Sequence, residues 1–373
     1  MIEYITIHDT ERQRVGIIDV FKSVLWARQY FGVGEFEVYV QATAENSALL
    51  KAGNYVSRDD DDEVGIIERV EKTFLPISGL MIIARGRFVK SLLSRRVIYR
   101  LSGNVNRPTV LSGKVETAVR SLVSAHVVSP TDAARQIPFV KLGELAGISH
   151  IITNSDGGSG SVQTSYANLL TFSDDLLQEY GMSARMTMDA AGNLLYTVFE
   201  GKDRSVGNAA GLQPLIFSQE FDNLSSTTYV HDGSGYKNTA LVGGSGEELA
   251  RFYILHGGSA AGMNRHELFI DARSINREYQ DEGEETQQYP ADVYTQMLTA
   301  EARRQLEPYA VTDSMTGEVD VTNSVYRYRQ DYDLGDLVTI RDDMVGVMTT
   351  TRIVRIIEAQ DENGYQIGLE FNA

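Results

Sequence analysis

The sequence predicts a mainly β protein of the α+β class, with two related β-barrel domains and two smaller α/β domains. Segments rich in β-branched and aromatic residues fill both ends of the 373-residue chain, whereas helical periodicity is confined to its middle. In addition, residues 324–340 nearly repeat residues 23–39. The length alone fits two to four domains of about 100 to 150 residues each.

The repeat pairs SVLWARQYFGVGEFEVY near the start with SVYRYRQDYDLGDLVTI near the end. Both stretches are predicted β-hairpins with a glycine in the turn. One half of the chain is then a diverged copy of the other, unless unrelated strand–turn–strand units have converged on β formers around a glycine. The identical pairs in an ungapped alignment are Ser23/Ser324, Val24/Val325, Arg28/Arg329, Gln29/Gln330 and Gly34/Gly335.

These patterns divide the chain into four predicted domains, one of which is split in the sequence. They are an N-terminal β-barrel domain (1–109), an α/β domain (110–205), a second β-barrel domain in two pieces (206–246 and 324–373) and an inserted α+β domain (247–323).

In the first domain, alternation at 2–7 and the segment VGIIDV predict two strands ahead of the first copy of the repeat. Thr43 is a candidate N-cap for a short helix over 44–52, and Gly53 is its natural C′ residue. About six strands in total fit a small barrel or sandwich. The remaining strands are predicted at 54–58, 64–74 and 80–87.

From about residue 110 the hydrophobic period becomes helical. A first helix is predicted behind a cap at Ser112, and a second over 166–180 ends at Gly181. A hairpin follows in ARMTMDAAGNLLYTVF, with its turn at 189–193. This order of elements predicts a compact α/β unit.

Strands resume at Pro214 with PLIFS, SSTTYVH and NTALVG, which resemble half a barrel. The inserted segment contains the strand pair RFYILH and HELFIDA and a helix over 291–306 that begins after Pro290. The second copy of the repeat, RIVRIIEAQ and YQIGLEF then complete the barrel.

Composition excludes several classes of protein. With no cysteine, the chain has no disulfides and no thiolate sites. No apolar run approaches the roughly 20 residues that span a bilayer, and the first residues lack the regions of a signal peptide, so we expect a chain made in the cytosol without stable membrane insertion. The balance of 51 acidic to 34 basic residues, net −17, opposes specific binding to DNA.

No catalytic, cofactor-binding or metal site is predicted, and the chain is not expected to be an enzyme. The glycine–serine loops at 157–161 and 243–247 both lack the final glycine of a nucleophile elbow. The sequence has no Walker glycine–lysine motif, and its glycine-rich loops do not open the strand–helix–strand unit that a GxGxxG site requires, so no nucleotide cofactor is expected. No two histidines are spaced to share a helical face as zinc ligands do.

The sequence contains two acidic stretches, at residues 59–63 and 331–336. Asp59, Asp60, Asp61, Asp62 and Glu63 suggest a calcium loop, but the EF-hand register places valine where glycine and the bidentate glutamate belong, so a solvated hairpin loop is favoured and cation binding stays open.

The second stretch contains Asp331, Asp333 and Asp336. These side chains suggest paired catalytic carboxylates, but turn chemistry explains them better, because carboxylate pairs are abundant in so acidic a chain.

An ordered series of segments resembles one known family across nearly the whole chain. The segments are VGIIDVFKSVLWARQYFGVGEFEVYV, GRFVKSLLSRRVI, SYANLL, GKDRS, IFS with FDNL, YKNTALVGG and DYDLGDLVTI. In this order they resemble the tail-hub family of long-tailed siphophages and their prophages, which is similar to the baseplate hubs of contractile phages.

The resemblance implies a virion structural protein, a homotrimeric ring at the phage tail tip, in which two related barrels per subunit give pseudo-sixfold symmetry. The implied partners are the distal tail protein, the tape-measure protein and a central fibre or spike protein. The bore would let phage DNA pass during genome ejection without specific binding. Many relatives continue beyond the last strand, so we expect any fibre or lytic domain to be a separate protein.

Two alternatives to the hub remain. A host receptor- or glycan-binding tail module would use the 19 tyrosines and 13 phenylalanines, although these fall mostly at alternating strand positions. A cell-wall glycan hydrolase would use a pair of carboxylates in a cleft between domains.

Overall fold

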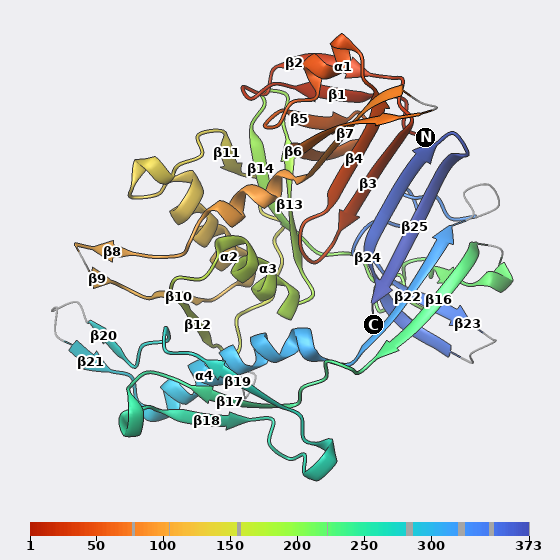
Figure 1. The fold of residues 1–373 in the computed structure, drawn as a ribbon. Coiled ribbons are helices and arrows are strands. Elements are labelled where there is room, and N and C mark those ends of the chain that lie inside the picture. The colour runs from red at the N-terminus through yellow and green to blue at the C-terminus, as the bar shows by residue number, and fades with distance from the viewer. Residues whose placement is uncertain are drawn as a thin grey trace.

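The computed structural model shows a mainly β protein, as predicted, and 16 strands of its described part join in one hydrogen-bonded network. The buried side chains of the described residues form four hydrophobic clusters. Strands from the two ends of the chain lie side by side, and helices α2 (Val115–Val123) and α3 (Leu169–Glu179) lie in the middle of the molecule (Figure 1). The structure describes residues 1–76, 79–103, 105–154, 158–221, 223–280, 286–319, 325–342 and 347–372.

The N-terminal strands form an antiparallel sheet in the order β2-β1-β5-β6-β7-β4-β3. Alternating apolar residues of these strands, among them Trp26, Phe36 and Ile82, face one core, as the period of two predicts. The first copy of the repeat is confirmed as the hairpin of β3 and β4. The strands are β1 (Ile5–His8), β2 (Arg14–Ile18), β3 (Ser23–Gln29), β4 (Glu35–Gln41), β5 (Tyr55–Arg58), β6 (Asp61–Leu75) and β7 (Gly79–Phe88).

The short helix α1 (Ala44–Leu49) begins as predicted, because the Thr43 side chain accepts a hydrogen bond from the Asn46 amide. It ends earlier than expected. Leu50 leaves the helical conformation, so Gly53, with its φ of 91°, lies beyond the helix and is not its C′ residue.

The next unit combines α2 (Val115–Val123) and α3 (Leu169–Glu179) with short strands. The predicted cap at Ser112 is wrong, since α2 begins after Lys114, whereas the Asn168 side chain caps α3. The predicted hairpin is confirmed as β13 and β14. The other elements are β8 (Leu101–Ser102), β9 (Val105–Asn106), β10 (Thr109–Ser112), the π-helical turn Ser124–Val128, β11 (Val140–Leu142), β12 (Ser161–Thr164), β13 (Ser183–Met188) and β14 (Leu194–Phe199).

The C-terminal sheet has the order β16-β22-β25-β24, and β24 continues to β23 and β15. Its core contains Phe217, Ile356 and Phe371. The strands are β15 (Ile216–Phe217), β16 (Leu224–Asp232), β22 (Thr312–Val319), β23 (Leu337–Asp342), β24 (Val347–Asp361) and β25 (Gly364–Asn372).

Two strands lie on the other side of the expected boundaries of the inserted segment. β17 (Thr239–Gly243), expected in the second barrel, pairs instead with β18 (Tyr253–His256) and β19 (Glu267–Asp271). Conversely β22, expected in the insertion, pairs with β16 and β25. The predicted helix 291–306 is confirmed as α4 (Ala291–Leu306), which packs on this smaller sheet.

The second copy of the repeat is only partly a hairpin. Residues 325–336 form turns with a single bridge between Tyr328 and Tyr332, and a regular strand begins only at Leu337. The prediction of a first strand here was wrong. Aromatic side chains of this segment pack on the core of the C-terminal sheet, and its charged side chains bind residues of the N-terminal sheet. Among the described residues, no helix combines the length and apolar character needed to cross a bilayer.

Candidate functional site

The two sheets meet where strands from opposite ends of the chain pair with each other. β3 runs antiparallel to β24, with Val24 to Gln29 opposite Gln360 to Arg355. Because one long strand serves both sheets, hydrogen bonding continues from the N-terminal sheet into the C-terminal one (Figure 1).

Arg28 of β3 lies at the centre of this junction, with only 4% of its side chain exposed. Its Nε donates to Glu63 Oε2 at 2.8 Å, and its Nη1 donates to Asp333 Oδ1 at 2.9 Å. Nη1 also donates to the Tyr328 hydroxyl at 2.8 Å. One guanidinium therefore binds both the first sheet and the turn segment that precedes β23.

Arg58 makes a second connection, and its side chain is fully buried. Nη2 contacts Asp60 Oδ2 at 2.6 Å and Glu358 Oε1 at 2.8 Å, which joins β5 to β24. The Tyr365 hydroxyl donates to the same Glu358 oxygen at 2.6 Å. The fork of a guanidinium suits this bridging between separate carboxylates.

Arg329 completes the set from the C-terminal side. Its Nη2 lies 2.7 Å from Asp61 Oδ2 and 3.2 Å from Glu358 Oε2. The Trp26 indole donates to the same Asp61 oxygen at 3.0 Å. We name the whole set the junction cluster: Arg28, Arg58, Arg329, Asp60, Asp61, Glu63, Asp333 and Glu358.

Burial sets the ionisation of this cluster. Loss of solvent raises the pKa of Glu63, and neighbouring Arg28 opposes that rise. Burial also raises the pKa of Tyr328 to about 12, so its hydroxyl keeps its proton. A cavity of about 430 Å³ opens beside the cluster, lined among others by Asp60, Tyr332 and Tyr365.

The first acidic stretch is a hairpin loop only in part. Asp59 and Asp60 form the exposed turn between β5 and β6, and Asp62 is also exposed, as the sequence favoured. Asp61 and Glu63 differ, because only 3% and 10% of their side chains are exposed and both bind arginines. Across the described part of the chain, no group of three or more His, Asp or Glu side chains is arranged to hold a metal ion.

The second acidic stretch does contain turn residues, as predicted. Asp331 accepts a hydrogen bond from the Arg327 amide at 2.7 Å, and Asp336 accepts one from the Lys202 amide at 2.7 Å. Burial raises the pKa of Asp336, whose Oδ2 lies 3.3 Å from Arg204 Nε. Only Asp333 joins the cluster.

The sequence contains one signal that points to the junction cluster. Arg28 lies in phase with Val24 and Trp26, which places its charge on the buried face of a strand. Arg329, its partner in the repeat alignment, enters the same cluster from the other end of the chain.

The sequence matches the model of one protein family. The model described as Siphovirus ReqiPepy6 Gp37-like protein matches residues 4–371. The chain belongs to this family. The Gp37-like family is one of siphovirus tail proteins, which confirms the resemblance expected from the ordered segments. Among curated proteins, none matches the chain.

Two solved structures share the fold of this Gp37-like protein. A 43 kDa tail protein of prophage MuSo2 from Shewanella oneidensis is 13% identical, with a TM-score of 0.54 over 99% of this chain and 98% of that one. A tail protein from Neisseria meningitidis is 11% identical, with a TM-score of 0.55 over 99% and 96%. At such identity the likeness shows a common architecture over the whole length.

Proposed function

We propose that this Gp37-like protein is the structural hub at the tail tip of a siphophage or prophage, assembled as a homotrimeric ring. The family supports a place in the tail, and the fold shared with prophage tail proteins supports a structural role. As a hub it would link the distal tail ring to a central fibre or spike, and its bore would pass the tape-measure protein and the genome.

The observation that carries this proposal is the junction between the two sheets. Six residue pairs between β3 and β24, together with the buried junction cluster, hold two β modules in one fixed relation. A ring of three subunits would then contain six such modules and match a sixfold tail. Closure of each module into a barrel is part of the proposal.

The charge of the chain supports passage of nucleic acid without adhesion. Three subunits would triple the formal net charge of −17, and acidic side chains along a bore would repel a polyanion. A strongly basic bore in a structure of the assembled ring would contradict this part of the proposal.

The junction cluster does not favour the glycan-hydrolase alternative. A glycosidase needs one protonated and one ionised carboxyl group facing a substrate cleft. Here Asp61, Glu63 and Glu358 are buried and each binds an arginine. Asp60, which lines the cavity beside the cluster together with Glu358, binds Arg58. We therefore propose an architectural protein that binds other tail components and performs no catalysis.

Mass measurement in solution tests the hub directly. Light scattering or native mass spectrometry should give about three times the chain mass of 41.3 kDa, and electron microscopy should show rings. A monomer that forms no ring together with the distal tail protein would contradict the proposal. Clearing of host cell walls in a zymogram would favour the hydrolase.

A further inference from the structure

A pocket of about 420 Å³ lies between two hairpins, β8–β9 and β20 (Glu278–Gln280) with β21 (Thr286–Gln288). Both hairpins project on the side of the molecule away from β24 (Figure 1). The pocket is therefore separate from the junction cluster. Its volume falls within the range of about 300 to 1,000 Å³ that is usual for small-molecule sites.

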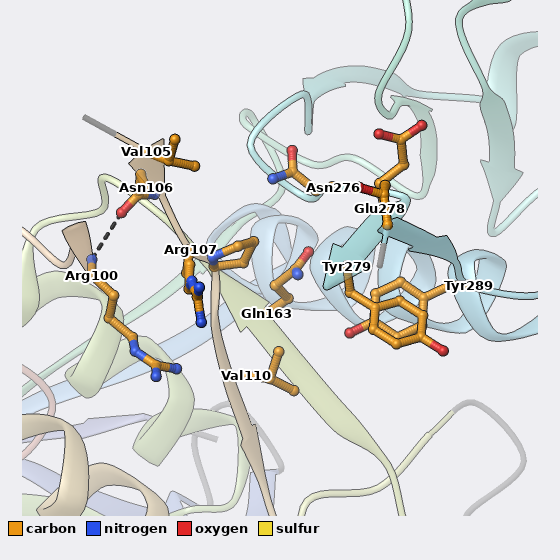
Figure 2. Close-up of a pocket in the computed structure, with 12 residues that line it drawn as sticks. Arg100, Val105, Asn106, Arg107, Val110, Gln163, Asn276, Glu278, Tyr279 and Tyr289 are labelled. Carbon is orange, nitrogen blue, oxygen red and sulfur yellow. Dashed lines mark hydrogen bonds between the residues drawn. The ribbon is translucent and has the colours of Figure 1, made fainter. Parts of the chain in front are cut away.

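One wall of the pocket is cationic. Arg100 and Arg107 are both exposed and lie on the same side of the pocket (Figure 2). No carboxylate in the described part of the chain forms an ion pair with either guanidinium. In a chain of net charge −17, whose arginines are commonly paired with carboxylates, two such neighbours are unusual.

The opposite wall is aromatic. Tyr279 and Tyr289 stack with ring centroids 4.5 Å apart and planes inclined by 31° (Figure 2). Tyr279 keeps 38% of its surface exposed, so part of the stacked pair remains available to a ligand. Aromatic faces of this kind bind the apolar C–H faces of sugar rings and other flat groups.

Between the two walls lies the side-chain amide of Gln163. Gln163 is only 3% exposed, and its buried Oε1 accepts no hydrogen bond from any residue that the structure describes. Such an atom costs free energy unless a ligand or water satisfies it. The nearby carboxylate of Glu278 accepts a hydrogen bond from Gln288 Nε2 at 3.2 Å, which holds it on its own hairpin.

We propose that this pocket binds an anionic carbohydrate, with a sugar ring on the tyrosine pair and its carboxylate or phosphate on Arg100 and Arg107. The amide of Gln163 would hydrogen-bond a hydroxyl of the same sugar. The pocket offers two guanidinium groups in an otherwise acidic chain, which suits a singly charged sugar better than the continuous phosphate backbone of a nucleic acid.

Binding is tested on the full chain by calorimetry and saturation-transfer NMR with three probes of equal length. They are a glucuronate-containing oligosaccharide, a sugar-phosphate oligomer and a neutral oligosaccharide. We expect at least one anionic probe to bind, and the neutral probe to bind roughly tenfold more weakly, because it lacks a charge-assisted pair. Preference between the two anionic probes identifies the natural oxyanion.

Variants locate the site. R100A, R107A and Y279A should each weaken binding about tenfold, the loss expected for one charge-assisted bond or one stacking contact. The matched controls R14A and Y253A change an exposed arginine and an exposed tyrosine elsewhere and should bind as the parent does.

Gln163→Met separates binding from folding. Because the buried oxygen has no partner in the free protein, the variant should melt at or above the parent temperature yet bind more weakly. Failure of all three probes, equal binding of the neutral probe, or equal loss in the control variants would each overturn the proposal. None of these outcomes bears on the hub, which is tested by its mass.

Discussion

Buried charge has a different role from surface charge in this molecule. Arg58 and Glu358 expose 0% and 2% of their side chains and bind each other at 2.8 Å, so neither is solvated by bulk water. A buried ion pair adds little net stability over an apolar pair, but removal of one member leaves the other charge uncompensated. The junction cluster is thus better suited to fixing the geometry of the two sheets than to raising stability.

Arg58→Met should accordingly lower the free energy of unfolding by about 3 to 5 kcal/mol, as measured by urea titration. The control Arg69→Met removes a pair with Glu71 from a side chain that is 69% exposed, and should cost at most about 1 kcal/mol. Arg58→Met with Glu358→Met should recover much of the loss, because the buried Glu358 charge is removed together with its partner, Arg329 keeps Asp61, and Asp60 is half exposed. Equal effects of Arg58→Met and Arg69→Met would contradict a structural role for the cluster.

A buried histidine makes the middle unit sensitive to acid. His126 lies in the π-helical turn after α2, is 2% exposed, and has an Nδ1 with no hydrogen-bond partner among the residues that the structure describes. Burial, together with the positive charges of Arg135 and Arg100, lowers the pKa of His126 from 6.5 to about 4. The folded state therefore binds fewer protons than the unfolded state between these pH values.

The contribution of neutral His126 to the free energy of unfolding is fully present above pH 6.5 and is lost as the pH falls toward about 4. The melting temperature of the parent should decline over this window, and His126→Gln should reduce the decline between pH 6.5 and 5. The matched control His150→Gln changes a ring that is 40% exposed, and should alter the decline less than His126→Gln does. A parent-like profile for His126→Gln would refute the assignment.

At the scale of elements, the aligned glycines of the repeat serve the same purpose in different structures. A Cβ on Gly34 would lie 2.2 Å from the Ala27 carbonyl oxygen within the β3–β4 hairpin. A Cβ on Gly335 would lie 2.2 Å from the buried ring of Tyr30, across the junction between the sheets. Close approach thus requires glycine in both copies, although only the first copy is a hairpin.

Gly335→Ala should destabilise the protein more than Gly364→Ala. Both glycines have positive φ, 93° and 119°, so both substitutions introduce backbone strain of about 1 to 3 kcal/mol. Only at Gly335 does the new methyl group also meet another side chain, which adds about 1 to 3 kcal/mol, whereas nothing lies within 4 Å of a Cβ on Gly364. Thermal melting measures the difference. Equal decreases in melting temperature would show that the Tyr30 ring moves aside for the new methyl group.

At the scale of the whole molecule, the local sequence pattern predicted which helices and strands form better than it predicted which of them lie next to one another. Helix 291–306 was correct at both ends because Pro290 and its apolar spacing act within a few residues. The strand at 239–243 was recognised but assigned to the wrong sheet, since strand partners depend on chain folding over long distances. The junction cluster was missed for the same reason, because Arg28 and Asp333 lie 305 positions apart.

The repeat predicted kinship of the two chain ends but not their direct pairing. The alignment pairs Arg28 with Arg329, and the structure brings both into one cluster. A sequence pattern with a period of two shows that a side chain is buried, and it does not show which other segment it meets. Charged residues in phase with a buried face are therefore the signal to follow in related chains.

The strands at the free edges of the two sheets offer a test of the ring. In the described part of the chain, β2 pairs only with β1, and β16 only with β22. Each carries an exposed valine, Val15 and Val230, both 46% exposed. Unpaired edges with apolar side chains readily pair with another chain, so we expect β16 of one subunit to meet β2 of the next.

If the proposed trimer forms through these edges, Val15→Lys and Val230→Lys should each shift the assembly from trimer to monomer in light scattering, because each introduces an unpaired charge at that contact. Val206→Lys, which changes a valine that is 48% exposed outside both edges, should leave the trimer intact. The double variant Val15→Glu with Val230→Lys should restore assembly, since every contact then joins opposite charges. Loss of the trimer in Val206→Lys, or its survival in both edge variants, would place the subunit contact elsewhere.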